Sequence, residues 1–424
     1  MQRGSEERRM EHVCVLGLGY IGLPTASLLA TKGFHVRGVD VRPDVISVVS
    51  NGELHFHEPD LDILVKSAVG SGNLTVATEP APAEIFIIAV PTPVTDTHAP
   101  DGSFIEAAAN AIAPHLAPGN LVILESTSPV GMTEQVGRRL AELRPDLRFA
   151  SRGGGDGPGA DRVFLAHCPE RVLPGRILRE LVDNDRIVGG VDRVSGERAQ
   201  AFYRKFVNGA VHVTDSRTAE LCKLAENAYR DVNIALANEL SLVCDRLGID
   251  PWGLIDLANR HPRVSILRPG PGVGGHCIAV DPWFIVDAAP DLTRLIRTAR
   301  DVNDEKPAFV VRKVLEKAER FRDPIIACLG LAYKADISDL RESPALEIVR
   351  TLASHGSARV VVVEPHIDAL PSALSSLGVV QEDLGRAVQQ ADIIVLLVDH
   401  RAFMDIDRAL LKEKVVIDTR GAWR

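Results

Sequence analysis

A cysteine in the second half of the chain has the surroundings of a nucleophile. Cys277 stands in the run PGPGVGGHCIAVDP, in which several glycines precede it with almost no side-chain bulk. Such a loop can bring backbone and sulfur against a substrate. A thiolate is a competent nucleophile toward an aldehyde, and His276 or Asp281 could influence the protonation of this thiol. A buried structural cysteine is the alternative interpretation of the same residues.

A second set of polar residues lies in a stretch that predicts one long helix. From about Thr214 to Leu247 the chain has no proline and no interior glycine, so the predicted helix is longer than is usual in globular domains. Lys223, Asn227 and Arg230 then share one helix face and could converge on a ligand. A solvated polar stripe is the alternative. The helix is expected to connect domains or to form a dimer interface.

The strongest binding motif lies near the N-terminus, in the run VCVLGLGYIGLP. Gly17, Gly19 and Gly22 have GxGxxG spacing where a strand pattern gives way to a helix pattern. These glycines permit a tight turn, close approach of backbone N–H groups to a pyrophosphate, and close packing of helix on strand. Asp40 ends the next strand pattern, and a carboxylate there favours NAD over NADP, while Arg42 leaves NADP open. A glycine-rich turn without a ligand is the alternative.

Alternating strand and helix patterns at both ends of the chain must position these residues. Buried-strand runs in the first third are VCVLGLG, VRGVDV, EIFIIAVP and NLVILEST, and those after Lys306 are IIACLGLAY, RVVVVEP, ADIIVLLV and KVVIDTRG. The predicted fold class is therefore α/β, with an N-terminal Rossmann-type doubly wound domain, a central helical region containing the long helix, and a second C-terminal α/β domain. The expected boundaries are a tail at 1–11 and domains at 12–212, 213–306 and 307–424.

Composition excludes several classes of protein. Hydrophobic residues make up 46% and charged residues 25%, which is typical of a folded globular chain. The net charge of −9, without a basic run, argues against nucleic acid as a partner. The apolar stretches are shorter than the roughly 18 residues of a membrane span, and the charged N-terminus lacks the pattern of a signal peptide, so a cytoplasmic location is expected. Six cysteines without metal-like spacing predict free thiols and no metal.

Taken together, the motifs resemble the UDP-glucose/GDP-mannose dehydrogenase family over nearly the whole chain. The matching runs are VLGLGYIGLP, AVPTP, ILESTSPVG, CPERVLPG, AELCKLAENAYRDVNIALANELS, NRHPRV, PGPGVGGHCIAVDPWF and LRESPA. The resemblance implies an NAD-dependent, four-electron oxidation of a sugar C6 alcohol to a carboxylate, and the runs are most similar to the branch that acts on UDP-N-acetyl-D-mannosamine. By this resemblance Cys277 forms a thiohemiacetal and then a thioester, and Lys223 handles protons and stabilises oxyanion charge at C6.

The resemblance also assigns site residues position by position. The reacting centre is implied to hold Cys277, Lys223, Asn227, Asp281, Thr127 and Glu170. NAD is implied to contact Gly17, Gly19, Tyr20, Ile21, Gly22, Asp40, Arg42, Thr92, Thr127 and Arg341. The UDP-sugar is implied to contact Arg171, Val172, Lys223, Asn227, Arg230, His261, Arg263, Gly274, Tyr333, Lys334 and Arg420. His261 and Arg263 are further implied to reach the neighbouring active site of a homodimer.

Other functions fit parts of the same sequence. By themselves, His261 and Arg263 in NRHPRV could be surface-loop residues. Glucose-type members of the family carry a second acidic residue where this chain has Pro174, so their site does not transfer whole. A dehydrogenase of another UDP-hexose, such as UDP-N-acetylglucosamine or UDP-glucose, is an alternative. A non-catalytic NAD or nucleotide-sugar sensor and a two-electron NAD dehydrogenase are more distant ones. The Gly-rich segment 151–161 is expected to be a surface loop without a chemical role.

Overall fold

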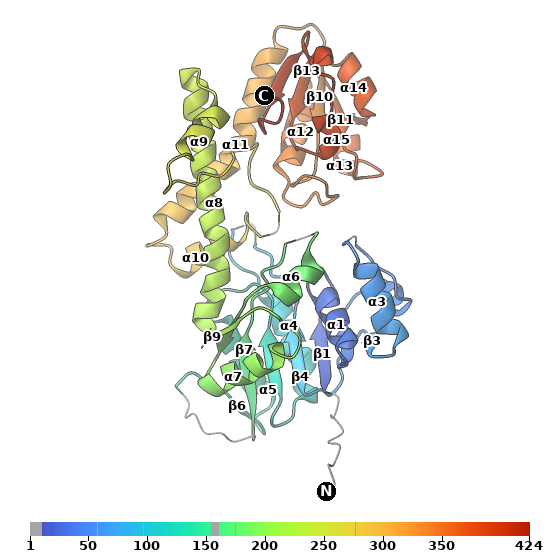
Figure 1. Cartoon of the computed structure of the whole chain (residues 1–424), viewed down its shortest axis with the longest axis vertical. Helices are drawn as coiled ribbons and strands as arrows, with labels where there is room; N and C mark the ends of the chain where they lie inside the picture. Colours follow the sequence, from blue (N-terminus) through green and yellow to red (C-terminus); the bar gives the residue numbers. More distant parts are fainter. Residues whose placement is uncertain (1–10, 57, 96, 154–160, 174, 276) are drawn as a thin grey trace. The chain divides into compact units, whose positions relative to one another are not determined.

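A computed structural model describes residues 11–56, 58–95, 97–153, 161–173, 175–275 and 277–424 (Figure 1). The chain divides into two compact units, Met1–Ala225 and Glu226–Arg424. The predicted long helix is confirmed as α8, Ser216–Leu247, which is continuous through the boundary between the units. Most of the Gly-rich segment, Pro174 and His276 lie outside the described residues.

The N-terminal unit is built on one mostly parallel sheet. Its strands are β1 His12–Leu16, β2 His35–Val39, β3 Leu74–Ala77, β4 Ile85–Ile88, β5 Leu121–Leu124, β6 Arg148–Phe149, β7 Arg162–His167, β8 Arg186–Gly190 and β9 Val211–Asp215. They are ordered β3-β2-β1-β4-β5-β7-β8-β9, with β6 paired to β7 and only the β7–β8 pair antiparallel among the described residues. In register, Val13 of β1 lies opposite Val36 on one side and Ile85 on the other. Apolar runs form these strands because both faces of a parallel sheet are buried.

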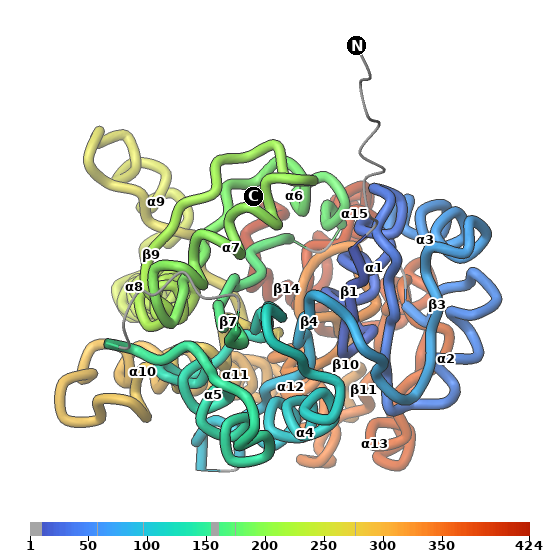
Figure 2. Tube along the Cα trace, turned by 90° about the horizontal axis from the view of Figure 1, so that it is seen from below, coloured from blue at the N-terminus to red at the C-terminus, as the bar shows by residue number. Residues whose placement is uncertain are grey.

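Helices cover both faces of this sheet (Figure 2). They are α1 Gly22–Thr31, α2 Pro43–Ser50, α3 Leu61–Gly70, α4 Ser103–Ile112 with the 3₁₀ turn Ala113–His115, α5 Met132–Leu143, α6 Ile177–Asp183 and α7 Arg193–Tyr203. One buried core joins α1, α3 and α7 to the strands, and a second joins α4 and α5 to the opposite face. The unit is the predicted doubly wound domain.

Helices α8, α9 Pro251–Ala258, α10 Asp281–Ala288 and α11 Arg294–Ala318 precede the second sheet. Polar groups fix α11 on the adjoining part of α8. Arg300 donates to buried Asp231 at 2.6 Å, and the side chain of Asn238 donates to Asn303 at 2.9 Å. Asn238 also accepts the backbone N–H of Gly270 at 2.9 Å. The loop that leads to Cys277 is therefore anchored on α8.

The second α/β domain is likewise confirmed. Its sheet is wholly parallel, in the order β12-β11-β10-β13-β14, and is formed by β10 Ile325–Leu329, β11 Arg359–Val363, β12 Val380–Gln381, β13 Ile393–Leu396 and β14 Val415–Asp418. Its helices are α12 Pro344–His355, α13 Ser372–Ser375, α14 Leu384–Gln390 and α15 Arg401–Met404, followed by the 3₁₀ turn Arg408–Leu411. Helices α11 and α12 pack on one face, and α14 and α15 pack on the other. Among the described residues, no helix combines the length and apolar character needed to span a membrane.

Candidate active site

The residues expected to bind the dinucleotide gather at one edge of the N-terminal sheet. Because β1, β2, β4, β5 and β7 run parallel, the loops that follow them meet at their carboxyl ends. Ligands of doubly wound sheets bind at this edge, where the strand order reverses, here between β1 and β4. The loops carry Gly17–Gly22 after β1, Asp40 and Arg42 after β2, Thr92 after β4, Thr127 after β5, and Glu170–Val172 after β7.

The geometry of the glycine loop suits a pyrophosphate. Gly17 has a φ of +90°, and a Cβ there would lie 2.4 Å from the carbonyl oxygen of Ala89. A Cβ on Gly22 would lie 1.8 Å from the carbonyl oxygen of Gly17, so the first turn of α1 packs directly on the loop. Gly19 faces open space, with no atom within 4 Å of its would-be Cβ among the described residues. The two outer glycines thus shape the turn, and the middle one leaves room for a phosphate at the helix N-terminus.

Asp40 holds this loop in place. Its Oδ2 accepts the N–H of Leu18 at 2.9 Å, and its Oδ1 accepts the N–H of Arg42 at 3.0 Å. The carboxylate is only half-buried, so it can still face a ribose. Arg42 is exposed and pairs with Asp44. Tyr20 stacks on Phe56 with ring centroids 4.4 Å apart.

The loops after β4 and β5 are joined to each other. The Thr92 hydroxyl donates to the carbonyl of Thr127 at 2.6 Å, which brings these two predicted cofactor residues together. The following turn is held by Glu220 of α8, whose carboxylate accepts N–H groups of Gly131 at 2.5 Å and Thr133 at 2.8 Å. Burial raises the pKa of Glu220. Sequence reasoning missed Glu220 because its partners lie more than eighty positions away.

Glu170 occupies a buried ion pair. Arg186 donates to its Oε2 at 2.7 Å, and the backbone N–H of Arg171 donates to its Oε1 at 2.6 Å. The pair is almost fully enclosed, with 6% of the Glu170 and 4% of the Arg186 side chain exposed. This arrangement favours a role for Glu170 in holding the loop after β7. Arg171 also donates to the carbonyl of Asp185 at 3.3 Å, and Val172 packs against the core.

In the C-terminal unit, three predicted catalytic residues come together around the start of α10. Cys277 is half-buried in the turn before this helix, and its carbonyl accepts the N–H of Asp281 at 2.8 Å. The side chain of Asn227 donates to Asp281 Oδ2 at 2.5 Å, and both side chains are buried. A thiol, an amide and a carboxylate thus share one small region. Within the described residues no cysteine forms a disulfide.

Lys223 lies one turn before Asn227 on α8 and is half-buried. Arg230 follows on the same helix and is exposed, so the predicted helical spacing of the three residues is confirmed. His261 and Arg263 are exposed in the loop after α9. The backbone N–H of Arg263 donates to His261 Nδ1 at 3.4 Å, which is a local contact within this loop.

The glycine loop before Cys277 packs on the loop after β10. A Cβ on Gly274 would lie 2.4 Å from the carbonyl oxygen of Glu342, and one on Gly275 would lie 2.8 Å from the Tyr333 ring. The N–H of Gly275 donates to the carbonyl of Arg341 at 3.3 Å. The Arg341 side chain pairs with Asp339 at 2.6 Å. Only glycines permit this approach, which explains the low bulk of the loop.

The remaining predicted substrate residues lie at the carboxyl edge of the second sheet. Tyr333 and Lys334 follow β10 and Arg420 follows β14, and all three line a small pocket together with Gly272 and Asp399. Arg420 donates to Asp399 at 2.9 Å. The pocket lies where the strand order reverses between β10 and β13, the expected position for a ligand of such a sheet. Asp399 was not predicted, because nothing in its local sequence marks it.

Comparison with known proteins relates most of the chain to one family. Three models of the UDP-glucose/GDP-mannose dehydrogenase family match: the NAD binding domain at residues 11–207, the central domain at 217–305 and the UDP binding domain at 327–424. An NDP-N-acetyl-D-galactosaminuronic acid dehydrogenase of Ralstonia nicotianae is 57% identical, covering 97% of this chain and 96% of its own. A UDP-N-acetyl-D-mannosamine dehydrogenase of Yersinia pestis is 53% identical, covering 98% and 99%.

A solved UDP-D-ManNAc dehydrogenase of Pyrococcus horikoshii superposes with a TM-score of 0.86 at 39% identity, covering 97% of this chain and 96% of its own. Fold, glycine loop and sequence relationship together define an NAD-dependent nucleotide-sugar dehydrogenase. The chain belongs to the UDP-glucose/GDP-mannose dehydrogenase family. NAD is its cofactor, in agreement with the expectation drawn from Gly17, Gly19, Gly22 and Asp40.

Proposed function

We propose that this enzyme oxidises the C6 alcohol of UDP-N-acetyl-D-mannosamine to the carboxylate in two successive steps. The observation that carries the proposal is the position of Cys277 in a glycine loop, directly before α10 and beside the buried Asn227–Asp281 hydrogen bond. A thiol is unnecessary for a two-electron oxidation. It has a clear use when an aldehyde must be retained and oxidised again. In this proposal residues 12–212 bind the cofactor, 213–306 supply the reacting groups and 307–424 bind the nucleotide.

Each side chain then has a defined task. Lys223 stabilises the alkoxide that forms on the C6 oxygen as the alcohol loses its proton. NAD⁺, when bound, would supply the acceptor for the hydride that C6 loses in each oxidation. The Cys277 sulfur adds to the resulting aldehyde, forming a C–S bond and an oxyanion that is protonated to a thiohemiacetal. Loss of a second hydride and a proton leaves a thioester. Water then attacks the thioester carbon, the C–S bond breaks, and the carboxylate and the free thiol are released. Asn227 and Asp281 position the reacting carbon and this water.

The second candidate substrate is the UDP derivative of N-acetylgalactosamine. The 57% identical relative is named for N-acetyl-D-galactosaminuronic acid, whereas those at 51–53% are named for N-acetyl-D-mannosamine. Both sugars carry a 2-acetamido group and differ in the orientation of substituents at C2 and C4. The mannosamine assignment rests on the runs CPERVLPG and NRHPRV, whose Arg171, His261 and Arg263 match contacts of that branch.

The experiment is to measure NADH formed per sugar and kcat/KM with four substrates: the UDP derivatives of N-acetylmannosamine, N-acetylgalactosamine, N-acetylglucosamine and glucose. Two NADH per UDP-N-acetylmannosamine and the highest kcat/KM for it are expected. Loss of buried hydrogen bonds to the acetamido group should disfavour UDP-glucose by about 10⁴-fold. A higher kcat/KM for UDP-N-acetylgalactosamine would change the assigned substrate and leave the assigned reaction in place. One NADH per sugar, or no turnover with any of the four, would refute the four-electron mechanism.

We further propose that the enzyme is a homodimer that uses α8. Five large apolar side chains on this helix are exposed, namely Leu221 at 43%, Tyr229 at 63%, Leu236 at 49%, Val243 at 48% and Leu247 at 64%. Tyr229, Leu236 and Val243 recur every seven residues, which places them along one helix face, and Leu247 lies one turn beyond Val243. A second copy of α8 would cover such a stripe. His261 and Arg263 would then be available to a neighbouring active site.

A cytoplasmic location is also part of the proposal. A thiol mechanism requires reduced cysteine, and the described residues contain no disulfide. NAD⁺ and UDP-sugars are available as substrates in the cytoplasm.

A further inference from the structure

Glu364 connects the loops that follow three neighbouring strands of the C-terminal sheet. Its Oε2 accepts the N–H groups of Leu331 at 2.7 Å and Ala332 at 3.1 Å, directly after β10. Its Oε1 accepts the N–H of His366 at 3.1 Å, after β11. Its Oε2 also lies 3.0 Å from His400 Nε2, after β13. The carboxylate is fully enclosed, with 0% of the side chain exposed, so all these contacts are internal.

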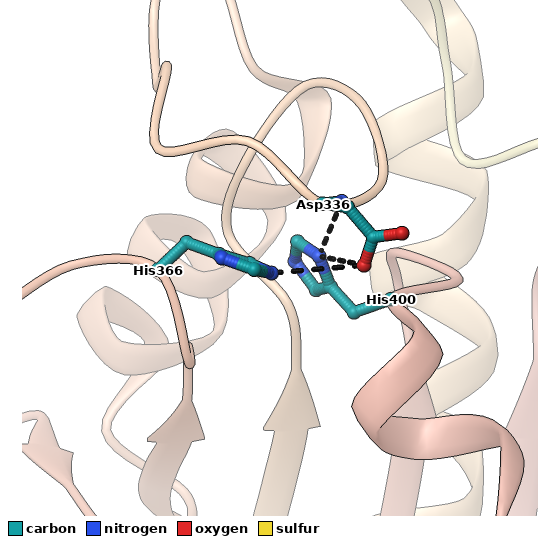
Figure 3. A group of neighbouring side chains, drawn as sticks. All are labelled: Asp336, His366 and His400. Carbon is teal, nitrogen blue, oxygen red and sulfur yellow. Dashed lines mark hydrogen bonds and ion pairs between the residues drawn. The ribbon is translucent and has the colours of Figure 1, made fainter. Parts of the chain in front are cut away.

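His400 extends this connection to the far end of the loop after β10. Its Nδ1 accepts the backbone N–H of Asp336 at 2.9 Å, so the ring proton is on Nε2 and is donated to Glu364. Although burial alone would raise the pKa of Glu364, the bonds from His400 and from the backbone lower it overall. Both ring nitrogens of His400 are therefore used, in one neutral tautomer, to join two loops. Figure 3 shows the contact of the ring with Asp336.

Asp336 has a backbone conformation that needs such support. Its φ is +59°, in the left-handed region, which costs a non-glycine residue roughly 1 kcal/mol. Arg401 holds the side chain, donating from its backbone N–H to Oδ1 at 3.0 Å and from Nε to Oδ2 at 2.8 Å. Together with the bond to His400, these contacts keep the segment 331–336 in a single arrangement.

A metal site is the competing interpretation of Asp336, His366 and His400, since one donor atom from each lies within 4.8 Å of the others. The geometry argues against it. The His400 lone pair that would bind a metal already accepts the Asp336 N–H, and the Asp336 carboxylate is paired with Arg401. His366 Nε2 is 3.7 Å from the same carboxylate and adds a weak ion pair when protonated.

In the N-terminal unit a carboxylate supports the glycine turn after β1 in the same way, but this carboxylate is more exposed. There Asp40 accepts the N–H of Leu18, one residue after Gly17, just as Glu364 accepts that of Leu331, one residue after Gly330. Gly17 and Gly330 have φ values of +90° and +94°. Asp40 is partly exposed, whereas Glu364 is covered. A ligand can touch the first carboxylate but not the second.

We propose that Glu364 and His400 are positioning residues for the nucleotide half of the substrate. The two loops that they join present Tyr333 and Lys334 from one side of the pocket and Asp399 from the other. Glu364 and His400 contact no ligand themselves. They fix the pocket walls before the uridine diphosphate binds. The free energy of binding therefore includes no entropic cost of ordering both loops. This inference rests on the proposed nucleotide site in the C-terminal unit.

The experiment measures the Kd of UDP by calorimetry for the wild type and for three variants of the full chain. His400→Phe keeps a planar aromatic ring and removes both hydrogen bonds, so the Kd of UDP should rise about tenfold or more. His400→Asn retains an acceptor for the Asp336 N–H, so it should recover part of this loss, to about threefold. Glu364→Gln keeps one oxygen and should also weaken UDP binding. In turnover, KM for the UDP-sugar should rise while kcat and the Kd of NAD⁺ change little.

The control is Asp392→Asn, which alters a carboxylate at the opposite end of the same sheet. Asp392 accepts the N–H of Ile325, the first residue of β10, at 2.9 Å. This variant should lower the melting temperature while leaving the Kd of UDP at the wild-type value. An unchanged Kd in folded His400→Asn and Glu364→Gln would overturn the inference. So would a rise in wild-type melting temperature with Zn²⁺ that is absent in His366→Ala. Failure of the wild type to bind UDP at all would instead refute the proposed nucleotide site.

Discussion

Glu125 offers a test of how the N-terminal unit depends on pH. This residue directly follows β5 and is 2% exposed, and its Oε1 accepts the hydroxyl of Tyr203 at 2.6 Å. Burial raises the pKa of Glu125 to about 7, with Arg186 opposing the rise and Glu170 adding to it. The perturbation is Glu125→Gln, which can still accept from Tyr203 but cannot ionise.

The size and sign of the effect follow from linkage. The folded protein retains this proton at pH values where the unfolded chain has lost it, so wild-type stability falls as the pH rises between the two pKa values. The interval from 4.5 to about 7, at about 1.4 kcal/mol per pKa unit, corresponds to about 3 kcal/mol. Relative to Glu125→Gln, the wild-type free energy of unfolding should therefore fall by about 3 kcal/mol between about pH 4.5 and pH 7.

The assay must report on the correct unit. All three tryptophans, Trp252, Trp283 and Trp423, belong to the C-terminal unit, so tryptophan fluorescence does not follow the N-terminal one. Hydrogen–deuterium exchange of peptides that contain β5 and β7 reports on the stability of the N-terminal unit. The exchange rate of each wild-type peptide is divided by that of the same Glu125→Gln peptide at each pH. This ratio removes the intrinsic pH dependence of amide exchange. Tyr203→Phe removes a bond that lowers the pKa of Glu125, so its stability should fall over a window that extends to higher pH. A ratio that stays constant from about pH 5 to pH 8 would refute the argument.

Three further predictions concern the active site and the dimer. Cys277→Ser should bind NAD⁺ and UDP-sugar nearly as wild type does but lower kcat by roughly 10³-fold or more, because serine is a far weaker nucleophile and a poorer leaving group; four-electron turnover at the wild-type rate would exclude the covalent route. Asp40→Ala should raise the Kd of NAD⁺ about tenfold and narrow the preference for NAD⁺ over NADP⁺, because two backbone donors lose their acceptor and a 2′-phosphate is no longer repelled. An unchanged ratio of the two Kd values in titrations would show that Asp40 does not contact the ribose. Leu236→Glu should convert the dimer to monomer in sedimentation experiments by placing a charge in the α8 stripe, whereas Glu239→Gln, on an exposed position of the same helix, should leave it dimeric; a dimeric Leu236→Glu would mean that the partners meet elsewhere.

Features that depend on neighbouring residues could be predicted from the sequence. The glycine spacing at Gly17–Gly22 determines a turn that only small residues can form, and the absence of breakers from Ser216 to Leu247 determines a helix. Buried parallel strands appear as short apolar runs, which is why both sheets were anticipated. The family motifs placed Asn227 and Asp281 in one site, and the structure joins them by a hydrogen bond across 54 positions.

Other features were decided only by the tertiary structure. The family resemblance implies that Glu170 belongs to the reacting centre, and only the structure shows that its carboxylate is paired with Arg186, which no motif connects to it. Glu364 and His400, separated by 36 positions, meet because two parallel strands end at the same edge of a sheet. Short-range spacing fixes backbone conformation, since φ, ψ and helical periodicity are properties of adjacent residues. The partner of a buried carboxylate is a property of the packed chain. Burial makes an unpaired charge costly, and the partner comes from the distant segment that packs against the carboxylate.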